Sequence, residues 1–154
     1  MLELAHAEAT VVRLMARAAA LDSLPGLEDV FRGRVAADEL MLIALAPGRQ
    51  DLVEAAAAHF DAVDPDALVI GETDGWTIWT ISGGAADEAF ARLSALPLPA
   101  TRPAFLQGAV AGVPAKVVAE PGRLHIVLVA SLGDHVRERV LSACADLEPT
   151  EVGS

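Results

Sequence analysis

The sequence contains a single cysteine, Cys144, and a single lysine, Lys116, among its 154 residues. One cysteine can form no internal disulfide and excludes a zinc site built from paired cysteines. This cysteine usage fits a reducing cytoplasm, where we expect the protein to be located. Basic residues number 11 against 22 acidic ones, a formal net charge of −11. We therefore expect neither nucleic acid nor an anionic membrane surface as the main partner, since both attract positive patches.

Long apolar runs are also missing. No run reaches the roughly 20 residues of a membrane-spanning helix, and residues 1–8 lack the basic and apolar regions of a secretory signal. Hydrophobic residues nevertheless make up 53% of the chain and charged residues 21%, as in globular proteins. We expect a single α+β domain over residues 1–148, with residues up to about 35 the least defined, and a flexible tail over residues 149–154.

Apolar segments of strand length recur along the chain. They occur at residues 38–45, 68–70, 76–81, 105–110, 114–119 and 124–129. Residues 76–81 are β-branched or aromatic throughout and direct apolar groups to both faces, which predicts an interior strand. Residues 68–70 are expected to be a short buried strand. The segments at 105–110 and 114–119 predict a hairpin, and turns are expected at residues 73–75 and 121–122.

Helical periodicity separates these strands. Three stripes are apolar at helical spacing: Leu52, Ala56, Phe60 and Val63; Ala85, Ala89, Leu93 and Leu96; Val136, Val140, Cys144 and Leu147. Asp134 is a candidate cap for the last of these helices. Residues 23–31 predict a short helix with Ser23 as N-cap and Pro25 in the first turn. Residues 10–18 stay ambiguous from composition, because their alanines favour helix and their Thr-Val-Val start favours strand.

Interleaved strands and helices, with short turns between strands in the second half, predict the fold class. We expect a mixed or antiparallel sheet with helices packed on one side, an α+β domain. Two similar halves can be suspected, but their residues do not repeat clearly enough to indicate a duplication.

Carboxylates and histidines are the first candidate functional groups. Asp61, Asp64 and Asp66 lie beside Pro65 after a helix, where a catalytic pair or a solvated loop is possible. We favour the loop, because acid–base catalysis needs a buried, tuned carboxylate. The four histidines are His6, His59, His125 and His135, which are far apart and show no metal-binding spacing. His59 is expected to be half-buried beside the helix stripe, and His125 and His135 could meet if the last strand and helix pack together.

Two further motifs allow a functional and a structural interpretation. Cys144 falls on an apolar helix stripe, where a buried thiol behaves as a small hydrophobe rather than a nucleophile. The Ser82-Gly83-Gly84 turn precedes a helix and could bind an anion through free backbone N–H groups. It lacks a full phosphate-binding fingerprint, so helix capping and close packing are the preferred explanation.

The two tryptophans and a proline-rich segment bear on partners. Trp76 and Trp79 are three apart on one strand and therefore point to opposite faces. Either both are buried within the domain, or one is covered by another chain, a second copy or a ligand. Residues 97–103 contain three prolines and should be extended, as a crossover strap or as a stiff arm that docks on a partner.

Four stretches, taken together in their order and spacing, resemble a known family. They are residues 38–42, 73–86, 105–114 and 124–131, within a region that runs from Asp38 to Leu141. This region resembles the small gamma subunit of heterotetrameric sarcosine oxidase, within the broader group of folate-binding aminomethyltransferase-like, or T-protein-like, domains. The resemblance implies a fold with ferredoxin-like βαβ elements, and it implies that the ambiguous first segment is a strand.

The same resemblance implies an accessory role. In the catalytically active aminomethyltransferases, an Asp follows the helix after the Ser-Gly turn and faces the folate, but residues 96–99 here read Leu-Pro-Leu-Pro. We therefore expect a non-catalytic subunit that assembles with larger flavin- and folate-binding subunits of a sarcosine oxidase-like oxidoreductase. It would have no catalytic, cofactor-binding or metal-binding residues of its own. The alternatives are a stand-alone folate-binding one-carbon protein and a small homo-oligomeric scaffold.

Overall fold

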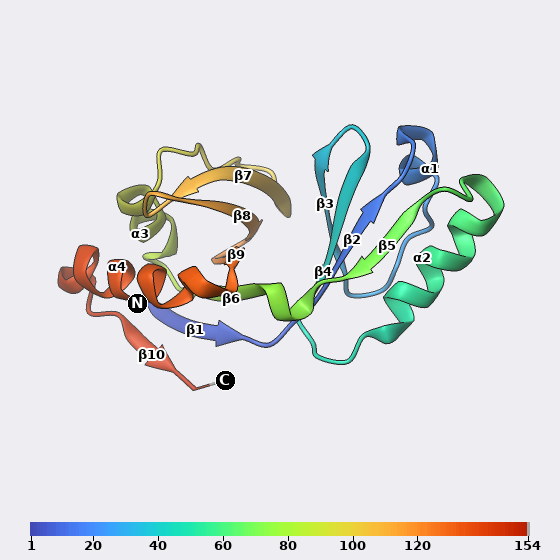
Figure 1. The fold of residues 1–154 in the computed structure, drawn as a ribbon. Helices are drawn as coiled ribbons and strands as arrows, with labels where there is room; N and C mark the ends of the chain where they lie inside the picture. The colour runs from blue at the N-terminus through green and yellow to red at the C-terminus, as the bar shows by residue number, and fades with distance from the viewer. Residues whose placement is uncertain (154) are drawn as a thin grey trace. The chain divides into compact units, whose positions relative to one another are not determined.

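The computed structural model describes residues 1–153, and the chain divides into two compact units. Unit 2 comprises Glu8–Thr73, and unit 1 comprises Met1–Ala7 together with the chain from Asp74 onward. Each unit is a β-sheet with helices packed on one face (Figure 1). The predicted α+β class with mixed and antiparallel sheets is therefore confirmed. That residues 1–148 act as one domain stays a prediction.

Unit 2 contains four strands and two helices. In chain order these are β2 (Thr10–Met15), α1 (Ala18–Asp22), β3 (Phe31–Ala36), β4 (Glu39–Ala44), α2 (Gln50–Val63) and β5 (Leu68–Gly71). The sheet order is β3-β4-β2-β5, and all neighbouring strands are antiparallel. Alternate residues of β2 and β4, such as Leu14 and Leu42, pack against Leu52, Ala56 and Phe60 of α2. The helix predicted at residues 50–63 is confirmed, although Val63 at its end is 37% exposed.

The N-terminal part of unit 2 tests two predictions. Residues 10–15 form a strand, as the family resemblance implied. The short helix predicted at residues 23–31 is wrong, because α1 ends at Asp22 and the hydroxyl of Ser23 donates to the carbonyl of Ala20 (3.0 Å). The alanines at residues 18–20 favour an earlier helix. Pro25 disfavours helical conformation at the residue before it, so the helix cannot resume there.

Two strands of unit 2 differ from the sequence expectation. The strand β3 was not predicted, because its two arginines interrupt the apolar pattern. The strand β5 was predicted as buried, yet it lies at the edge of the sheet. Its side chains Leu68 and Ile70 are 54% and 36% exposed. An apolar run without charges does not distinguish a central strand from an edge strand.

Unit 1 contains a six-stranded sheet and two longer helices. In chain order the elements are β1 (Glu3–Ala7), β6 (Trp76–Ser82), α3 (Ala86–Leu93), β7 (Ala104–Val110), β8 (Val113–Glu120), β9 (Arg123–Val129), α4 (Gly133–Ala143) and β10 (Thr150–Val152). Short 3₁₀ turns cover Ala130–Leu132 and Ala145–Leu147 in this unit, and a third, Thr73–Gly75, spans the chain position where unit 2 ends and unit 1 resumes. The order is β10-β1-β6-β9-β8-β7, with β10 parallel to β1 and the other pairs antiparallel.

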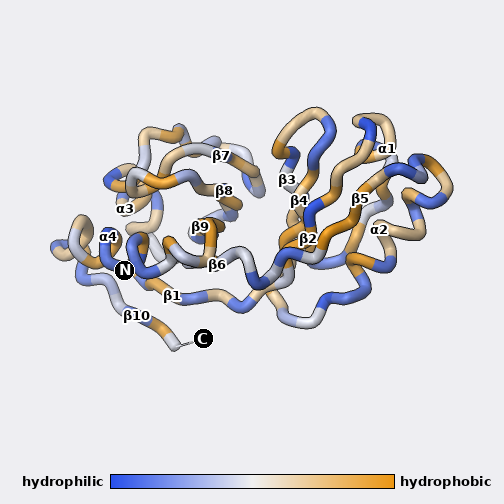
Figure 2. Tube along the Cα trace, in the orientation of Figure 1, coloured by the Kyte–Doolittle hydropathy of each residue, from blue (hydrophilic) through white to orange (hydrophobic). Residues whose placement is uncertain are grey.

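The core of unit 1 lies between the sheet and the helices α3 and α4. Phe90 of α3 and Val136 and Val140 of α4 belong to the same buried cluster as Leu124 and Ile126 of β9. Figure 2 shows apolar residues concentrated along strands such as β9 in unit 1 and β2 in unit 2. No helix in the described part of the chain is both long and apolar enough to span a membrane.

The predicted interior strand and hairpin of unit 1 are confirmed. The strand β6 pairs with β1 and β9 on its two sides, and β7 pairs with β8 across the turn at residues 111–112. The helix α3 ends at Leu93, three residues earlier than its stripe predicted. Asp134 lies inside the first turn of α4 rather than at its cap.

Both ends of unit 1 form strands that were not predicted. The strand β1 was missed, and residues 149–154, expected to be a flexible tail, include β10. Thr150, Glu151 and Val152 pair in parallel with Glu3, Leu4 and Ala5 (Figure 1). Such a short strand gains its structure from the neighbouring strand, so its own residues carry little signal.

Candidate functional site

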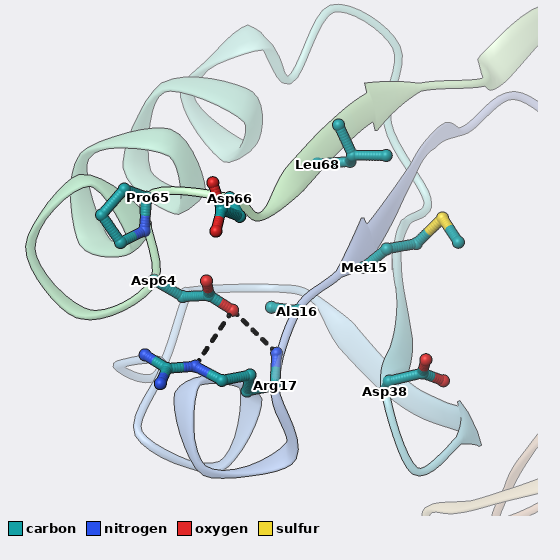
Figure 3. A pocket seen from close by; sticks show the side chains of 8 residues that line it. All are labelled: Met15, Ala16, Arg17, Asp38, Asp64, Pro65, Asp66 and Leu68. Carbon is teal, nitrogen blue, oxygen red and sulfur yellow. Dashed lines mark hydrogen bonds and ion pairs between the residues drawn. The ribbon is translucent and has the colours of Figure 1, made fainter.

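An open hollow of about 540 Å³ lies in unit 2, where the end of β2, the β3–β4 turn and the α2–β5 loop meet. Its lining residues are Met15, Ala16, Arg17, Asp38, Asp64, Pro65, Asp66 and Leu68 (Figure 3). Two of the three candidate carboxylates from the sequence, Asp64 and Asp66, therefore line it together with Asp38. The third, Asp61, is exposed on α2 outside the hollow.

Asp64 is the buried member of this group, at 6% exposure. Its Oδ2 accepts a hydrogen bond from the backbone N–H of Arg17 (2.8 Å) and lies 3.6 Å from the Arg17 Nε (Figure 3). The Arg17 guanidinium also donates to the carbonyl of Val63 (2.6 Å). Because Arg17 immediately precedes α1, the Asp64 carboxylate satisfies an N–H at the start of that helix. Through these contacts Asp64 connects the end of α2 to the start of α1.

The remaining carboxylates of the hollow do not form a reactive pair. Asp38 and Asp66 are exposed and make no ion pair within residues 1–153. Acid–base catalysis needs a buried carboxylate, and neither of these two is buried. The solvated-loop interpretation thus describes Asp66, whereas Asp61 is exposed within α2 and Asp64 is buried and hydrogen-bonded.

A second polar cluster centres on His125 in β9, which is 1% exposed. Its Nδ1 lies 2.8 Å from the hydroxyl of Thr80, and its Nε2 lies 2.6 Å from a carboxylate oxygen of Glu120. Burial lowers the pKa of His125, and the hydrogen bond with Glu120 opposes this shift. A neutral ring has one donor nitrogen, and the carboxylate can only accept. We therefore assign the proton to Nε2, so that Thr80 donates to Nδ1.

The sequence singled out His125 but not its partners. Thr80 lies directly opposite His125 in the β6–β9 register. Glu120 and Arg123 face each other across the turn at residues 121–122, and this places Glu120 diagonally from His125 on β8. The predicted turn could have indicated the Glu120 contact, whereas the Thr80 contact depends on pairing between strands far apart in sequence. The hydroxyl–imidazole–carboxylate order resembles an activated nucleophile, but this Thr is β-branched and confined within an interior strand.

The other histidines have separate partners. The Nε2 of His6 lies 3.0 Å from the Thr77 hydroxyl, and the Nε2 of His59 lies 3.0 Å from the Ser23 hydroxyl. His135 donates to the carbonyl of Ala111 (2.8 Å), so the structure does not bring it to His125. Within residues 1–153 no three His, Cys, Asp or Glu side chains lie close enough to hold a metal ion.

The Ser82-Gly83-Gly84 turn is built for close packing. Gly83 has a φ of 108°, and a Cβ there would lie 2.5 Å from the carbonyl oxygen of Met1. The same Met1 oxygen accepts the backbone N–H of Ala85 (3.0 Å) at the start of α3. The first turn of α3 also contains Asp87 and Glu88, whose charges disfavour a bound anion. These contacts favour the capping interpretation over an anion site.

The proline-rich segment is fastened within unit 1. The Ser94 hydroxyl donates to the carbonyl of Ala109 (2.7 Å), and Leu96 and Leu98 pack against the core cluster. The guanidinium of Arg102 binds both carboxylate oxygens of Asp87 at 3.0 and 2.7 Å. The segment therefore has the contacts of a crossover strap rather than those of a free docking arm.

The tryptophans and the cysteine complete the set of candidates. Trp79 and Trp76 are both half-buried, and Trp79 packs against the core cluster beneath the helices. The Trp79 indole N–H is buried without a hydrogen-bond partner in the described residues. Cys144 is fully buried, and this burial raises the pKa of its thiol. A protonated, inaccessible thiol acts as part of the core, as predicted from the helix stripe.

Comparison with known proteins defines the class of fold. No family model matches the sequence, and no curated protein matches it. Solved structures do match, and they place the chain in the fold found in sarcosine oxidase and aminomethyltransferase T.

Two of these structures are informative. A chain of the heterotetrameric sarcosine oxidase from Corynebacterium sp. U-96, in complex with pyrrole 2-carboxylate, matches with a TM-score of 0.81 and 16% identity, over 98% of this chain and 87% of that one. The glycine cleavage system aminomethyltransferase T from Bartonella henselae matches with a TM-score of 0.66 and 16% identity over 98% of this chain. This chain spans about half of the aminomethyltransferase, 47% of its length. Identities this low show the shared fold alone.

Proposed function

We propose that the chain is a non-catalytic accessory subunit, similar to the gamma subunit of heterotetrameric sarcosine oxidase. In this proposal it assembles in the cytoplasm with larger subunits that bind flavin and folate. The observation that best supports this proposal is the extent of the structural match, which covers 98% of this chain and 87% of a sarcosine oxidase chain. The chain is therefore comparable with most of one chain of a multi-subunit oxidase, but with only about half of an aminomethyltransferase.

The contacts of the candidate residues support a structural role. Asp64 fastens two helices, and the Ser82-Gly83-Gly84 turn packs on the N-terminus of the chain. Leu96 occupies the region where the active aminomethyltransferases are expected to have an acid, and it packs against the core. The order β-α-β-β-α-β in unit 2, with sheet order β3-β4-β2-β5, supports the ferredoxin-like element that the resemblance implied.

Co-expression tests this proposal directly. The chain would be tagged and expressed with the products of adjacent oxidase-like genes, and the purified material would be analysed by gel and by flavin absorbance. We expect the large subunits to co-purify in fixed proportion, with flavin present only when they are present. Purification of the chain alone, from cells that contain soluble large subunits, would contradict the proposal.

The likeness to aminomethyltransferase T supports a second candidate, a stand-alone folate-binding one-carbon protein. Titration with tetrahydrofolate would be followed by tryptophan fluorescence and by the thermal unfolding midpoint. Both tryptophans lie on β6, so a ligand near this strand should quench their emission. No quenching and no thermal shift at millimolar tetrahydrofolate would remove this candidate.

A further inference from the structure

The four edge strands of the two sheets are protected to different degrees. An edge strand exposes unpaired N–H and C=O groups, and proteins usually protect it with charges, bulges, shortness or cover. The strand β3 carries Arg32 and Arg34 and a register irregularity, and β10 is only three residues long. On the edge strand β7, the Ala109 carbonyl accepts a hydrogen bond from the Ser94 hydroxyl of the strap. The strand β5 reads Leu-Val-Ile-Gly, with a regular register and no charge.

The free backbone groups of β5 follow from its pairing with β2. Glu72 donates its backbone N–H to Val11 (2.9 Å), which makes Val11 and Glu72 a hydrogen-bonded pair. Hydrogen-bonded and non-hydrogen-bonded pairs alternate along antiparallel strands. Leu68 and Ile70 therefore direct their backbone groups to β2, and Val69 and Gly71 direct theirs outward. An added strand would find donors and acceptors at these two residues.

The side chains of β5 offer an apolar surface next to these groups. Leu68 and Ile70 are two residues apart and so lie on one face of the sheet, where they are 54% and 36% exposed. Val69 packs instead against the core beneath the helices. Leu68 is paired with the half-buried Met15 of β2, and both line the hollow described above. The exposed face of the edge is thus continuous with that hollow.

The acidic lining of the hollow favours a basic residue in any segment that binds at this edge. Arg17 and Asp64 are engaged with each other, whereas Asp38 and Asp66 are exposed and make no ion pair within residues 1–153. Figure 3 shows Asp66 and Asp38 in the same lining as Leu68 and Met15. A basic side chain at the end of an added strand next to Leu68 would therefore meet the Asp66 carboxylate beside the apolar contacts.

We propose that β5 is a docking edge for an extended segment of a partner protein, apolar at alternate positions and basic at the end beside Asp66. A second copy of the chain fits poorly. Antiparallel self-pairing centred on Val69 would place Asp66 of each copy opposite Glu72 of the other, and each copy carries a net charge of −11. The inference rests on the proposed function only in taking the partner to be a protein.

A library of random peptides displayed on phage provides the probe, with peptides long enough to form a strand of about six residues. We expect selection on the intact chain to enrich peptides that alternate apolar residues and carry Lys or Arg near one end.

Leu68→Lys and Ile70→Lys should each weaken binding of such a peptide by about tenfold or more, because they place a charge on the docking edge. Val152→Lys is the matched control, since Val152 is 43% exposed on the edge strand β10. Circular dichroism would confirm that each variant is folded.

The charge preference and the backbone contact need their own measurements. Asp66→Asn should weaken binding several-fold and reduce its salt dependence, whereas Asp61→Asn, outside the hollow, should not. Amide exchange should slow at Val69 and Gly71 when the peptide binds.

The inference is overturned if no peptide is enriched, or if the enriched peptides bind equally well to Leu68→Lys. It is also overturned if light scattering shows that wild-type chain dimerises and that Leu68→Lys abolishes the dimer.

Co-expression separates this inference from the proposed function. If large oxidase subunits co-purify equally with wild type and with Leu68→Lys, the docking edge is wrong and the accessory role stands. If no subunit co-purifies but the peptide binds at β5, the accessory role is wrong and the docking edge stands.

Discussion

At the scale of single residues, His125 is a buried titratable side chain of unit 1. Its ring is buried between Thr80 and Glu120, and the burial lowers its pKa below the ordinary histidine value of 6.5. Glu120 favours the protonated ring, whereas the charge of Arg123 disfavours it. Desolvation is the largest of these effects, so the folded protein holds His125 neutral where the unfolded chain would protonate it.

This shift predicts loss of stability in mild acid. Because the folded-state pKa is lower than the unfolded value, His125 lowers the free energy of unfolding as the pH falls below about 6.5. Urea unfolding of wild type and His125→Gln between pH 7.5 and 5 would measure it. We expect the variant to be less stable at pH 7.5 but to have a flatter pH profile. His135→Gln, at an exposed histidine, serves as control, and parallel profiles for wild type and His125→Gln would contradict the account.

A second prediction concerns the effect of Gly83 on the stability of the folded protein. It combines a φ of 108° with a hypothetical Cβ contact of 2.5 Å to the Met1 carbonyl. We expect Gly83→Ala to lower the free energy of unfolding by about 1–3 kcal/mol. The neighbouring Gly84 has no atom within 4 Å of such a Cβ, so Gly84→Ala should be nearly neutral. Equal urea midpoints for the two variants would argue against the packing role of this turn.

At the scale of elements, the strap over residues 94–103 is fastened by one arginine. Arg102 binds Asp87 on α3 and also donates to the carbonyls of Pro99 (3.0 Å) and Glu120 (3.3 Å). We expect Arg102→Ala to loosen the strap and to speed its cleavage by chymotrypsin near Leu96 and Leu98. Arg139→Ala, at an exposed arginine of α4, is the control. Unchanged cleavage of Arg102→Ala would show that the leucines alone hold the strap.

Elements differ in how far their own sequence predicts them. The helix α2 and the strand β6 were predicted within a residue of their ends, since each has a clear apolar period. The strands β1 and β10 were missed because they depend on pairing with neighbours distant in sequence, and β3 was missed because its two arginines interrupt the apolar pattern. This long-range pairing is invisible to any local pattern.

The contacts of the candidate site residues also depend on partners distant in sequence. Asp64 and His125 were recognised as chemically interesting residues from the sequence. The partner of Asp64, Arg17, lies 47 residues away, and Thr80 lies 45 residues from His125. The sequence therefore indicates which groups carry charge or can titrate. The register of distant strands and helices decides whether those groups become catalytic or structural.

At the scale of the whole molecule, the two compact units raise the question of cooperativity. Both tryptophans lie in unit 1, so fluorescence reports on that unit, whereas far-ultraviolet circular dichroism reports on helices and strands of both. If residues 1–148 act as one domain, the two signals should give coincident urea transitions. A circular dichroism transition without a matching fluorescence change would show that unit 2 unfolds separately.

We propose that this chain completes a larger assembly without supplying reactive groups. Native mass spectrometry of the chain co-expressed with adjacent oxidase-like gene products tests it most directly. We expect a hetero-oligomer in which this chain is present in fixed ratio, and release of the chain without flavin or folate. A stable homo-oligomer of the chain alone, in the presence of folded large subunits, would contradict it.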